Sequence, residues 1–333
     1  METNTINLLN KYHDLIGVLD LSSKKIYGLL DLIKYKRTIN LKCFLNKITN
    51  LDNLPPNLIK LDCCRNNLVL LDNLPPNLIE LDCCRNNLVL LDNLPQSLIK
   101  LNCSHNNLVS LDKLPMKLIK LDCSYNNLVL LNNLPNTLIK LDCIQNKINS
   151  LDNLPNTLIK LDCTANRINS LDNLPNSMIK LSCSYNFISN LDNLPNSIIY
   201  LCCSSNNISK LDNLSNNIIE LFCDNNNILN LDNLPKKLKI LKCSSTKITT
   251  LNNLPNSLIK LDCTYTHITE LNNLSDEVRL RFDVEKIKFL NGLKVKTNFN
   301  ITKINKCIYC SNINNFISIE KAIRIMCMNE DII

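Results

Sequence analysis

Apolar positions recur along most of this chain with a period of twenty residues. Within residues 58–68 the spacing is Leu-x-x-Leu-x-Cys-x-x-Asn-x-Leu, with polar side chains at many of the intervening positions. The same spacing returns at 78–88 and 98–108, and it continues to 258–268 with Leu, Ile and Met exchanging. A second recurrent segment, Leu-Asp-Asn-Leu-Pro at 71–75, connects each copy to the next. A period this strict predicts a solenoid, in which one supersecondary unit is stacked many times.

The alternation inside each copy predicts one short strand of about four residues. Alternate residues of a strand point to opposite faces, so we expect Leu61 and Cys63 to face inward and Lys60, Asp62 and Cys64 to face outward. Neighbouring strands would then stack about 4.8 Å apart as a parallel sheet. The recurrent Pro fixes one backbone angle and donates no hydrogen bond, which favours an extended return segment over a helix.

An asparagine column follows the strands and runs without a break from Asn46 to Asn226. A side-chain amide both donates and accepts, so these residues can satisfy backbone groups of adjacent copies. Thr246 and Thr266 replace the asparagine in the last two regular copies. A hydroxyl satisfies fewer groups, and we therefore predict that this end of the array opens first.

These residues and spacings resemble the leucine-rich repeat, and the twenty-residue length with its Leu-Pro ending resembles the short subclass of bacterial effectors. The Asn, Ile and Lys richness is similar to that of putative leucine-rich repeat proteins of giant amoebal (mimivirus-like) viruses. The resemblance implies an α/β-class, right-handed solenoid with a concave parallel sheet and an extended convex side. It also implies a recognition surface. The ubiquitin-ligase domain of the bacterial relatives is not carried over, because only about forty nonrepetitive residues follow the array.

The organisation predicted from the pattern has three parts. Residues 1–40 would form a cap helix, at 5–17, and a degenerate first repeat; residues 41–293 would form the array; and residues 294–333 would form a second cap. Thirteen copies are counted from Leu19 to Leu261. A fourteenth, around Leu280, is offset by one residue, and a hairpin turn at 291–292 is the alternative there.

Charge and hydropathy narrow the classes of partner. The net charge of +7 comes from the terminal segments, because the repeats carry as many acidic as basic side chains. We therefore expect no nucleic-acid partner, since such proteins concentrate positive charge on their working face. No apolar run is long enough to span a bilayer, and residues 1–5 are polar, without a hydrophobic secretion segment. We expect no membrane partner and an intracellular, cytoplasmic location, in the host cytoplasm if the chain is viral.

Twelve of the eighteen cysteines occupy one column, from Cys43 to Cys263, at the inward strand position. Free cysteine behaves there as a small hydrophobe, and reduced core thiols are the favoured interpretation over a metal or disulfide ladder. Cys307, Cys310 and Cys327 supply three potential zinc ligands where structural zinc wants four, so packing thiols are favoured there too. We predict no metal and no cofactor.

Enzymatic chemistry is not indicated. His13, His105 and His267 are far apart in the array, which disfavours a Ser-His-Asp or Cys-His arrangement. Three glycines could not build a phosphate-binding loop. The turn residues Arg65, Arg85, His105, Tyr125, Gln145, Tyr185 and Tyr265 look like unselected surface, because no common chemistry unites them.

The outward strand positions form a Lys column beside an Asp column, which we interpret as a solvated, mutually screened face, with a docking strip as the alternative. Both columns are interrupted by apolar and aromatic residues. The predicted partner-binding residues are Tyr185, Phe187, Tyr200, Cys202, Phe222 and Ile240. The predicted function is non-enzymatic protein binding through the concave face. A structural or multimeric component, or a substrate-recruiting subunit for a separately encoded ubiquitin ligase, are the alternatives.

Overall fold

The computed structural model describes residues 17–269, 278–282, 307–310 and 316–318. They fall into two compact units, which are described one at a time. Unit 1 is Met1–Ile168 with Asn173–Met178, and unit 2 is Asn169–Asp172 with Ile179–Ile333. No helix among the described residues is long and apolar enough to cross a membrane.

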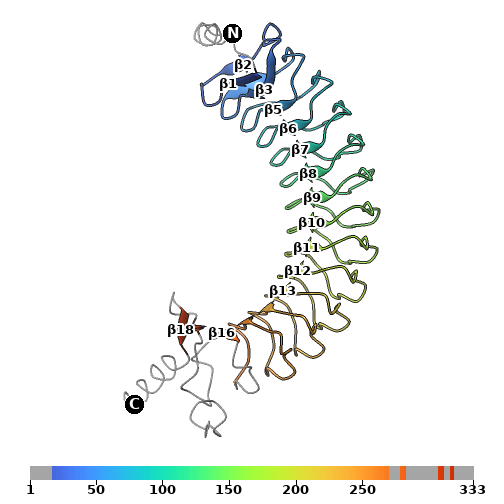
Figure 1. Ribbon diagram of the computed structural model, residues 1–333, viewed down its shortest axis with the longest axis vertical. Coiled ribbons are helices and arrows are strands. Elements are labelled where there is room, and N and C mark those ends of the chain that lie inside the picture. Colours follow the sequence, from blue (N-terminus) through green and yellow to red (C-terminus); the bar gives the residue numbers. More distant parts are fainter. Residues whose placement is uncertain (1–16, 270–277, 283–306, 311–315, 319–333) are drawn as a thin grey trace. The chain divides into compact units, whose positions relative to one another are not determined.

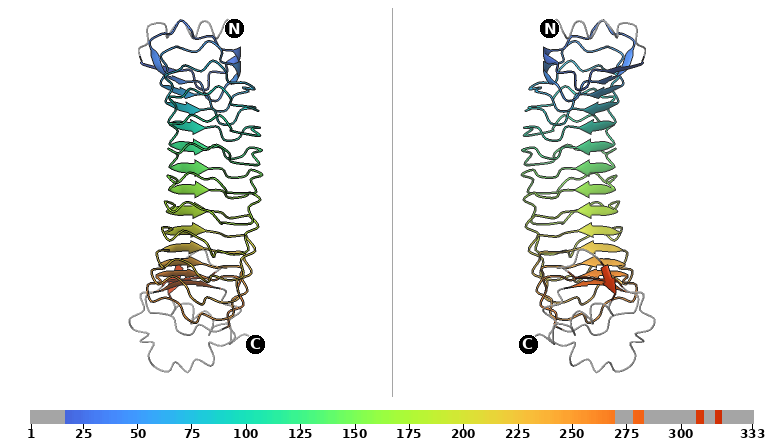
Figure 2. Two further views of the ribbon diagram at one scale, coloured as in Figure 1. Left: turned by 90° about the vertical axis from the view of Figure 1, so that its right-hand side faces the viewer. Right: turned by 90° about the vertical axis from the view of Figure 1, so that its left-hand side faces the viewer.

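Unit 1 is built on one parallel sheet with one short strand for each copy (Figure 1). Its strands are, in spatial order, β1 (Gly17–Asp20), β3 (Thr38–Lys42), β5 (Lys60–Asp62), β6 (Glu80–Asp82), β7 (Lys100–Asn102), β8 (Lys120–Asp122), β9 (Lys140–Asp142) and β10 (Lys160–Asp162). Figure 2 shows these strands stacked edge to edge and pointing the same way. A separate parallel pair, β2 (Tyr27–Leu29) with β4 (Lys47–Asn50), lies in the first copies.

Unit 2 continues the same plan. Its strands are β11 (Lys180–Ser182), β12 (Tyr200–Cys202), β13 (Glu220–Phe222), β14 (Ile240–Lys242), β15 (Lys260–Asp262), β16 (Arg279–Phe282), β17 (Cys307–Cys310) and β18 (Phe316–Ser318). The ladder is parallel from β11 to β17, and β18 pairs antiparallel to β17. Leu280 of β16 pairs with Leu261 of β15, so the one-residue offset still yields a parallel strand of the predicted fourteenth copy.

The register explains the core. Leu41, Leu61 and Leu81 are paired with one another along the ladder, and each is at most 2% exposed. Cysteines of the twelve-residue column lie two positions further on, and all twelve are buried and form no disulfide. The predicted inward positions are therefore confirmed. Several of these thiols also donate to the next copy, as Cys63 Sγ does to the Asp82 carbonyl oxygen at 3.4 Å.

Each copy turns out of its strand through a left-handed residue, such as Arg65 with a φ of 53° or Tyr125 with a φ of 55°. In many copies a second left-handed residue is the asparagine before Leu-Pro in the segment Leu-Asp-Asn-Leu-Pro, as at Asn73 with a φ of 56°. Asparagine tolerates this region better than most residues, which accounts for its recurrence there. The return segment that follows holds no helix within the described residues, so the predicted extended return is confirmed.

The asparagine column joins successive copies, as predicted. Asn66 Nδ2 donates to the carbonyl oxygens of Cys43 and Cys63, each at 3.0 Å, and its Oδ1 accepts from the Ile48 amide at 3.0 Å. Thr246 contributes less to joining the copies, because its hydroxyl donates to the Cys243 carbonyl oxygen at 2.7 Å, which belongs to the same copy.

Residues 5–16 of the predicted cap helix and the hairpin alternative at 291–292 lie outside the described residues, and Gly17 is the first residue of β1. The side chains of Cys307, Cys310 and Cys327 are not described either. Of the predicted second cap, only the backbone of β17 and β18 is described, and Ser318 ends β18. The proposed domain boundaries stay predictions.

Candidate interaction surfaces

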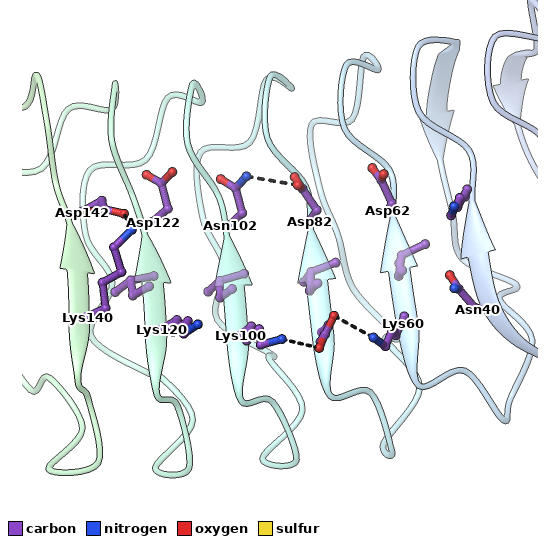
Figure 3. Close-up of a pocket in the computed structure, with 16 residues that line it drawn as sticks. Asn40, Lys60, Asp62, Asp82, Lys100, Asn102, Lys120, Asp122, Lys140 and Asp142 are labelled. Carbon is purple, nitrogen blue, oxygen red and sulfur yellow. Dashed lines mark hydrogen bonds and ion pairs between the residues drawn. The ribbon is translucent and has the colours of Figure 1, made fainter.

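The strand face of unit 1 carries the predicted Lys and Asp columns around a shallow groove of about 450 Å³ (Figure 3). The lysines do not pair mainly with the Asp column. Lys60 and Lys100 both reach Glu80, with Nζ to carboxylate distances of 3.1 Å and 2.6 Å. Lys140, by contrast, forms an ion pair with Asp142, and this pair connects the Lys column with the Asp column. The predicted mutual screening is therefore only partial.

The Asp column has a structural role that the pattern did not indicate. Asp62 Oδ1 accepts the Cys64 amide at 3.1 Å, and Asp82 Oδ1 accepts the Cys84 amide at 3.1 Å, so each carboxylate caps the turn after its strand. Asn102 makes the same bond to the Ser104 amide at 3.1 Å. Burial raises the pKa values of Asp62, Asp82 and Asp142, because a carboxylate loses hydration between neighbouring strands. Asp62, Asp82 and Asn102 are turn caps, whereas the Ile144 amide that follows Asp142 donates to Ser124 Oγ at 3.2 Å. A cluster of this kind is not by itself a binding site.

On the strand face of unit 2, aromatic and apolar residues interrupt the charged columns on β12, β13 and β14. The rings of Tyr200 and Phe222 lie 5.4 Å apart between centroids, tilted by 50°. Cys202 pairs with Phe222 in the strand register, and its Sγ lies 3.1 Å from Ser184 Oγ. Ile240 lies beside Glu220 on the next strand. These four residues, Tyr200, Cys202, Phe222 and Ile240, are called the aromatic patch below.

Lysines flank the aromatic patch on both sides. Lys180 Nζ lies 5.8 Å from the centre of the Tyr200 ring, and Lys242 Nζ lies 5.1 Å from that of Phe222. Both distances fall within the range of a cation–π contact. Burial raises the pKa of Tyr200, so its hydroxyl keeps its proton to a higher pH than that of an exposed tyrosine. The patch thus combines ring faces with two nearby positive charges.

The structure divides the six predicted contact residues into two groups. The aromatic patch is half-buried, because each side chain lies against neighbours on adjacent strands. Tyr185 and Phe187 lie in the turn after β11 and are 64% and 57% exposed. Tyr185 is held there by a left-handed backbone, with a φ of 54°, and by a hydrogen bond from its amide to Ser204 O at 2.9 Å.

Three of the turn residues of unit 1, which were predicted to share no common chemistry, lie against one another in the structure. The rings of His105 and Tyr125 are stacked, with centroids 4.1 Å apart and planes 7° from parallel. Arg85 approaches the other side of His105, with 3.5 Å between Nη2 and Nε2. Burial, and then the Arg85 charge, lower the pKa of His105. Stacking of the copies makes these side chains, one period apart, neighbours. All three residues have the left-handed backbone of the turn after the strand.

Cys64 and Cys84 form a disulfide between successive copies, which the sequence analysis did not predict. Cys64 was predicted to face outward. A second outward cysteine one period later, Cys84, is the sequence signal that could have revealed the pair. Together with Asp82 they are the one group of three potential metal ligands among the described residues. The disulfide uses both sulfur atoms.

No family model and no curated protein matches the sequence. Solved structures do match. YopM from Yersinia enterocolitica WA-314 has a TM-score of 0.69 and 33% identity, over 77% of this chain and 61% of that chain. A leucine-rich effector protein, YopM from Yersinia pestis, has a TM-score of 0.60 and 27% identity, over 83% and 90%. The functional domain of InlJ from Listeria monocytogenes, which includes a cysteine ladder, has a TM-score of 0.53 and 26% identity, over 79% and 72%.

The fold is therefore a leucine-rich repeat solenoid, as the period of twenty residues and the resemblance to that family predicted. Among the similar structures are YopM and InlJ, and this chain spans 61% of the length of the Y. enterocolitica YopM chain. The resemblance to viral repeat proteins stays a prediction, as does the cellular location.

Proposed function

We propose that this chain is a non-enzymatic module that binds a protein partner through the aromatic patch on the strand face of unit 2. The single observation that carries the proposal is the interruption of the charged columns by Tyr200 and Phe222, whose rings lie 5.4 Å apart between centroids. The solenoid needs no aromatic residue there, because other copies carry Lys or Asp at the same positions. Clustered aromatic residues are typical of the energetic centres of protein interfaces.

The charges around the patch favour a particular partner chemistry. Lys180 and Lys242 lie at its two edges, and Glu220 is the acidic residue between them in the strand register. An apolar or aromatic side chain flanked by carboxylates would contact the rings and pair with the two lysines. A protein segment offers that combination more readily than a nucleic acid, whose phosphates would meet a repeat array of balanced charge.

Tyr185 and Phe187 extend the proposal to the adjacent turn. Their exposed rings add aromatic surface beside the same copies, and contiguous exposed apolar surface often marks a contact site. We propose that they contact the edge of the same partner and contribute less than the half-buried pair, because contacts at an interface rim remain solvated.

The test is affinity capture from native cells with the full chain, followed by mass spectrometry. The variant Tyr200→Lys with Phe222→Asp installs residues that the chain already uses in these two columns, as at Lys260 and Asp262, so the fold is expected to be retained. We expect the amount of captured partner protein to fall at least tenfold. A control with Lys100→Ala and Lys120→Ala, in the same Lys column of unit 1, should capture as the wild type does. Unchanged capture by the aromatic-patch variant would overturn the proposal.

A further inference from the structure

A stripe of exposed apolar side chains crosses four successive copies of unit 1. It consists of residues 69–70, 89–90, 109 and 129–130, which are all Val or Leu. Leu70 is 60% exposed, Val109 is 53% exposed and Leu130 is 48% exposed. These positions are called the Val/Leu stripe. They belong neither to the strand face nor to the aromatic patch.

Local geometry explains why the stripe faces solvent. In the first of these copies, Leu68 and Leu71 are buried, at 0% and 6% exposure, and the two residues between them are turned outward. The copies are held against each other beside the stripe, since the Asn87 amide donates to Leu68 O and the Asn107 amide donates to Leu88 O, both at 2.8 Å. The exposed valines of four successive copies therefore form a continuous row, and the leucines beside them are interrupted at Ser110.

The fold does not require apolar residues in this row. The equivalent positions are Asn149 and Ser150, and then Asn169 and Ser170, in the copies that follow. The stripe is thus confined to four consecutive copies and ends abruptly at residue 130. Its exposed area is on the order of 500 Å², a size that the largest apolar patch of a single chain reaches and that is often functional.

We propose that the Val/Leu stripe is the contact through which two copies of this chain associate. Two stripes packed on each other would bury on the order of 1,000 Å², which reaches the lower end for specific protein contacts. A row of Val and Leu side chains that recurs once per copy can pack against the same row of a second chain, as a two-fold contact requires. The stripe carries no charge, so a second apolar stripe matches it better than a charged partner does.

The association can be tested by measuring the mass of the full chain by light scattering over a series of concentrations. A variant with Val69→Asn, Leu70→Ser, Val129→Asn and Leu130→Ser takes the residues that the chain itself carries at 149–150. We expect the wild-type mass to approach that of two copies as concentration rises, and the variant to associate at least tenfold more weakly. Leu229→Ser is the matched control, because Leu229 is 59% exposed but lies outside the stripe.

The Tyr200→Lys/Phe222→Asp variant separates the two surfaces and should associate as the wild type does. A wild-type chain that keeps the mass of one copy at every concentration would overturn the inference. So would a stripe variant that associates with wild-type strength, or a stripe variant that loses capture of a different protein while the wild type remains a single copy.

Discussion

Asn66 Nδ2 donates a hydrogen bond to the carbonyl oxygen of Cys43 at 3.0 Å, and this bond joins one turn of the solenoid to the preceding turn. The same amide group bonds Cys63 O and the Ile48 amide. Because the side chain is only 6% exposed, water cannot readily replace these bonds. Equivalent asparagines repeat the arrangement, so each copy is stabilised by its neighbour, as expected of a linear repeat protein.

The asparagine column should therefore be sensitive to truncation. In Asn126→Ala, the Leu108 amide and the carbonyl oxygens of Cys103 and Cys123 would lose their partner. We expect the free energy of unfolding to fall by about 1–3 kcal/mol, the usual cost of buried groups left without a hydrogen bond. Urea denaturation followed by circular dichroism measures this change. Asn127→Ala is the control, and equal destabilisation by both variants would contradict the assigned role.

Unit 2 offers the reverse experiment at Thr246. Its hydroxyl bonds Cys243 O, whereas Asn226 in the preceding copy also reaches Cys203 O and the Ile208 amide. In Thr246→Asn, the new side chain should reach Cys223 O and the Ile228 amide, raising local stability by about 1 kcal/mol. Hydrogen exchange should become slower at Ile228. Exchange that is uniform along the wild-type array would argue against a weaker end at this copy.

The Cys64–Cys84 disulfide should stabilise the third and fourth copies, which it joins. It closes a loop with a sequence separation of 20 residues, for which the chain-entropy estimate is about 3 kcal/mol. Cys64→Ser with Cys84→Ser should unfold at lower urea, and a reductant should destabilise the wild type by a similar amount. The same reductant should leave the double variant unchanged. If reduction shifted both chains equally, the stabilisation would have to come from elsewhere.

The raised pKa of Asp62 gives a pH dependence of definite sign. When the pKa of a carboxyl group is raised in the folded state, the protonated group favours the folded state. This stabilisation is complete below the usual Asp pKa of about 4, and it is lost as the pH rises through the raised, folded-state pKa. Asp62→Asn removes the charge and keeps an oxygen acceptor for the Cys64 amide. We expect it to be more stable than the wild type at pH 7, by no more than about 0.5 kcal/mol because solvent screens a half-buried carboxylate.

This advantage should disappear near pH 3, where the wild-type carboxyl is protonated. Urea titrations at the two pH values measure it. Asp112→Asn is the control, since it removes the same charge from an exposed side chain. A constant difference between Asp62→Asn and the wild type at both pH values would show that ionisation of Asp62 is not the cause.

Sequence reasoning worked best for the residues that point inward. The spacing of Leu61, Cys63 and Leu68 leaves one way to bury all three in a repeated turn, and each is at most 2% exposed. It worked less well for outward residues. Asp62 was assigned to a screened charged surface, but its carboxylate caps a turn. That role depends on the backbone direction after the strand, which a hydrophobic pattern does not encode.

The candidate sites show the same division. The interruption of the charged columns at Tyr200 and Phe222 is visible in the sequence, but the packing of their rings and the positions of the flanking lysines are not. Exposure of the Val/Leu stripe was also missed. Its members follow a buried leucine directly, and only the path of the turn decides which side faces water.

The sequence by itself determined the repeat, the parallel strands, the thiol-lined core and the asparagine column, because a strict period with one apolar face permits a single way of stacking. Tertiary structure alone decided which outward side chains meet: Cys64 with Cys84, His105 with Tyr125, and Tyr200 with Phe222. Stacking makes residues about twenty positions apart neighbours, and whether they bond, stack or diverge depends on turn geometry and side-chain direction, which the spacing leaves open.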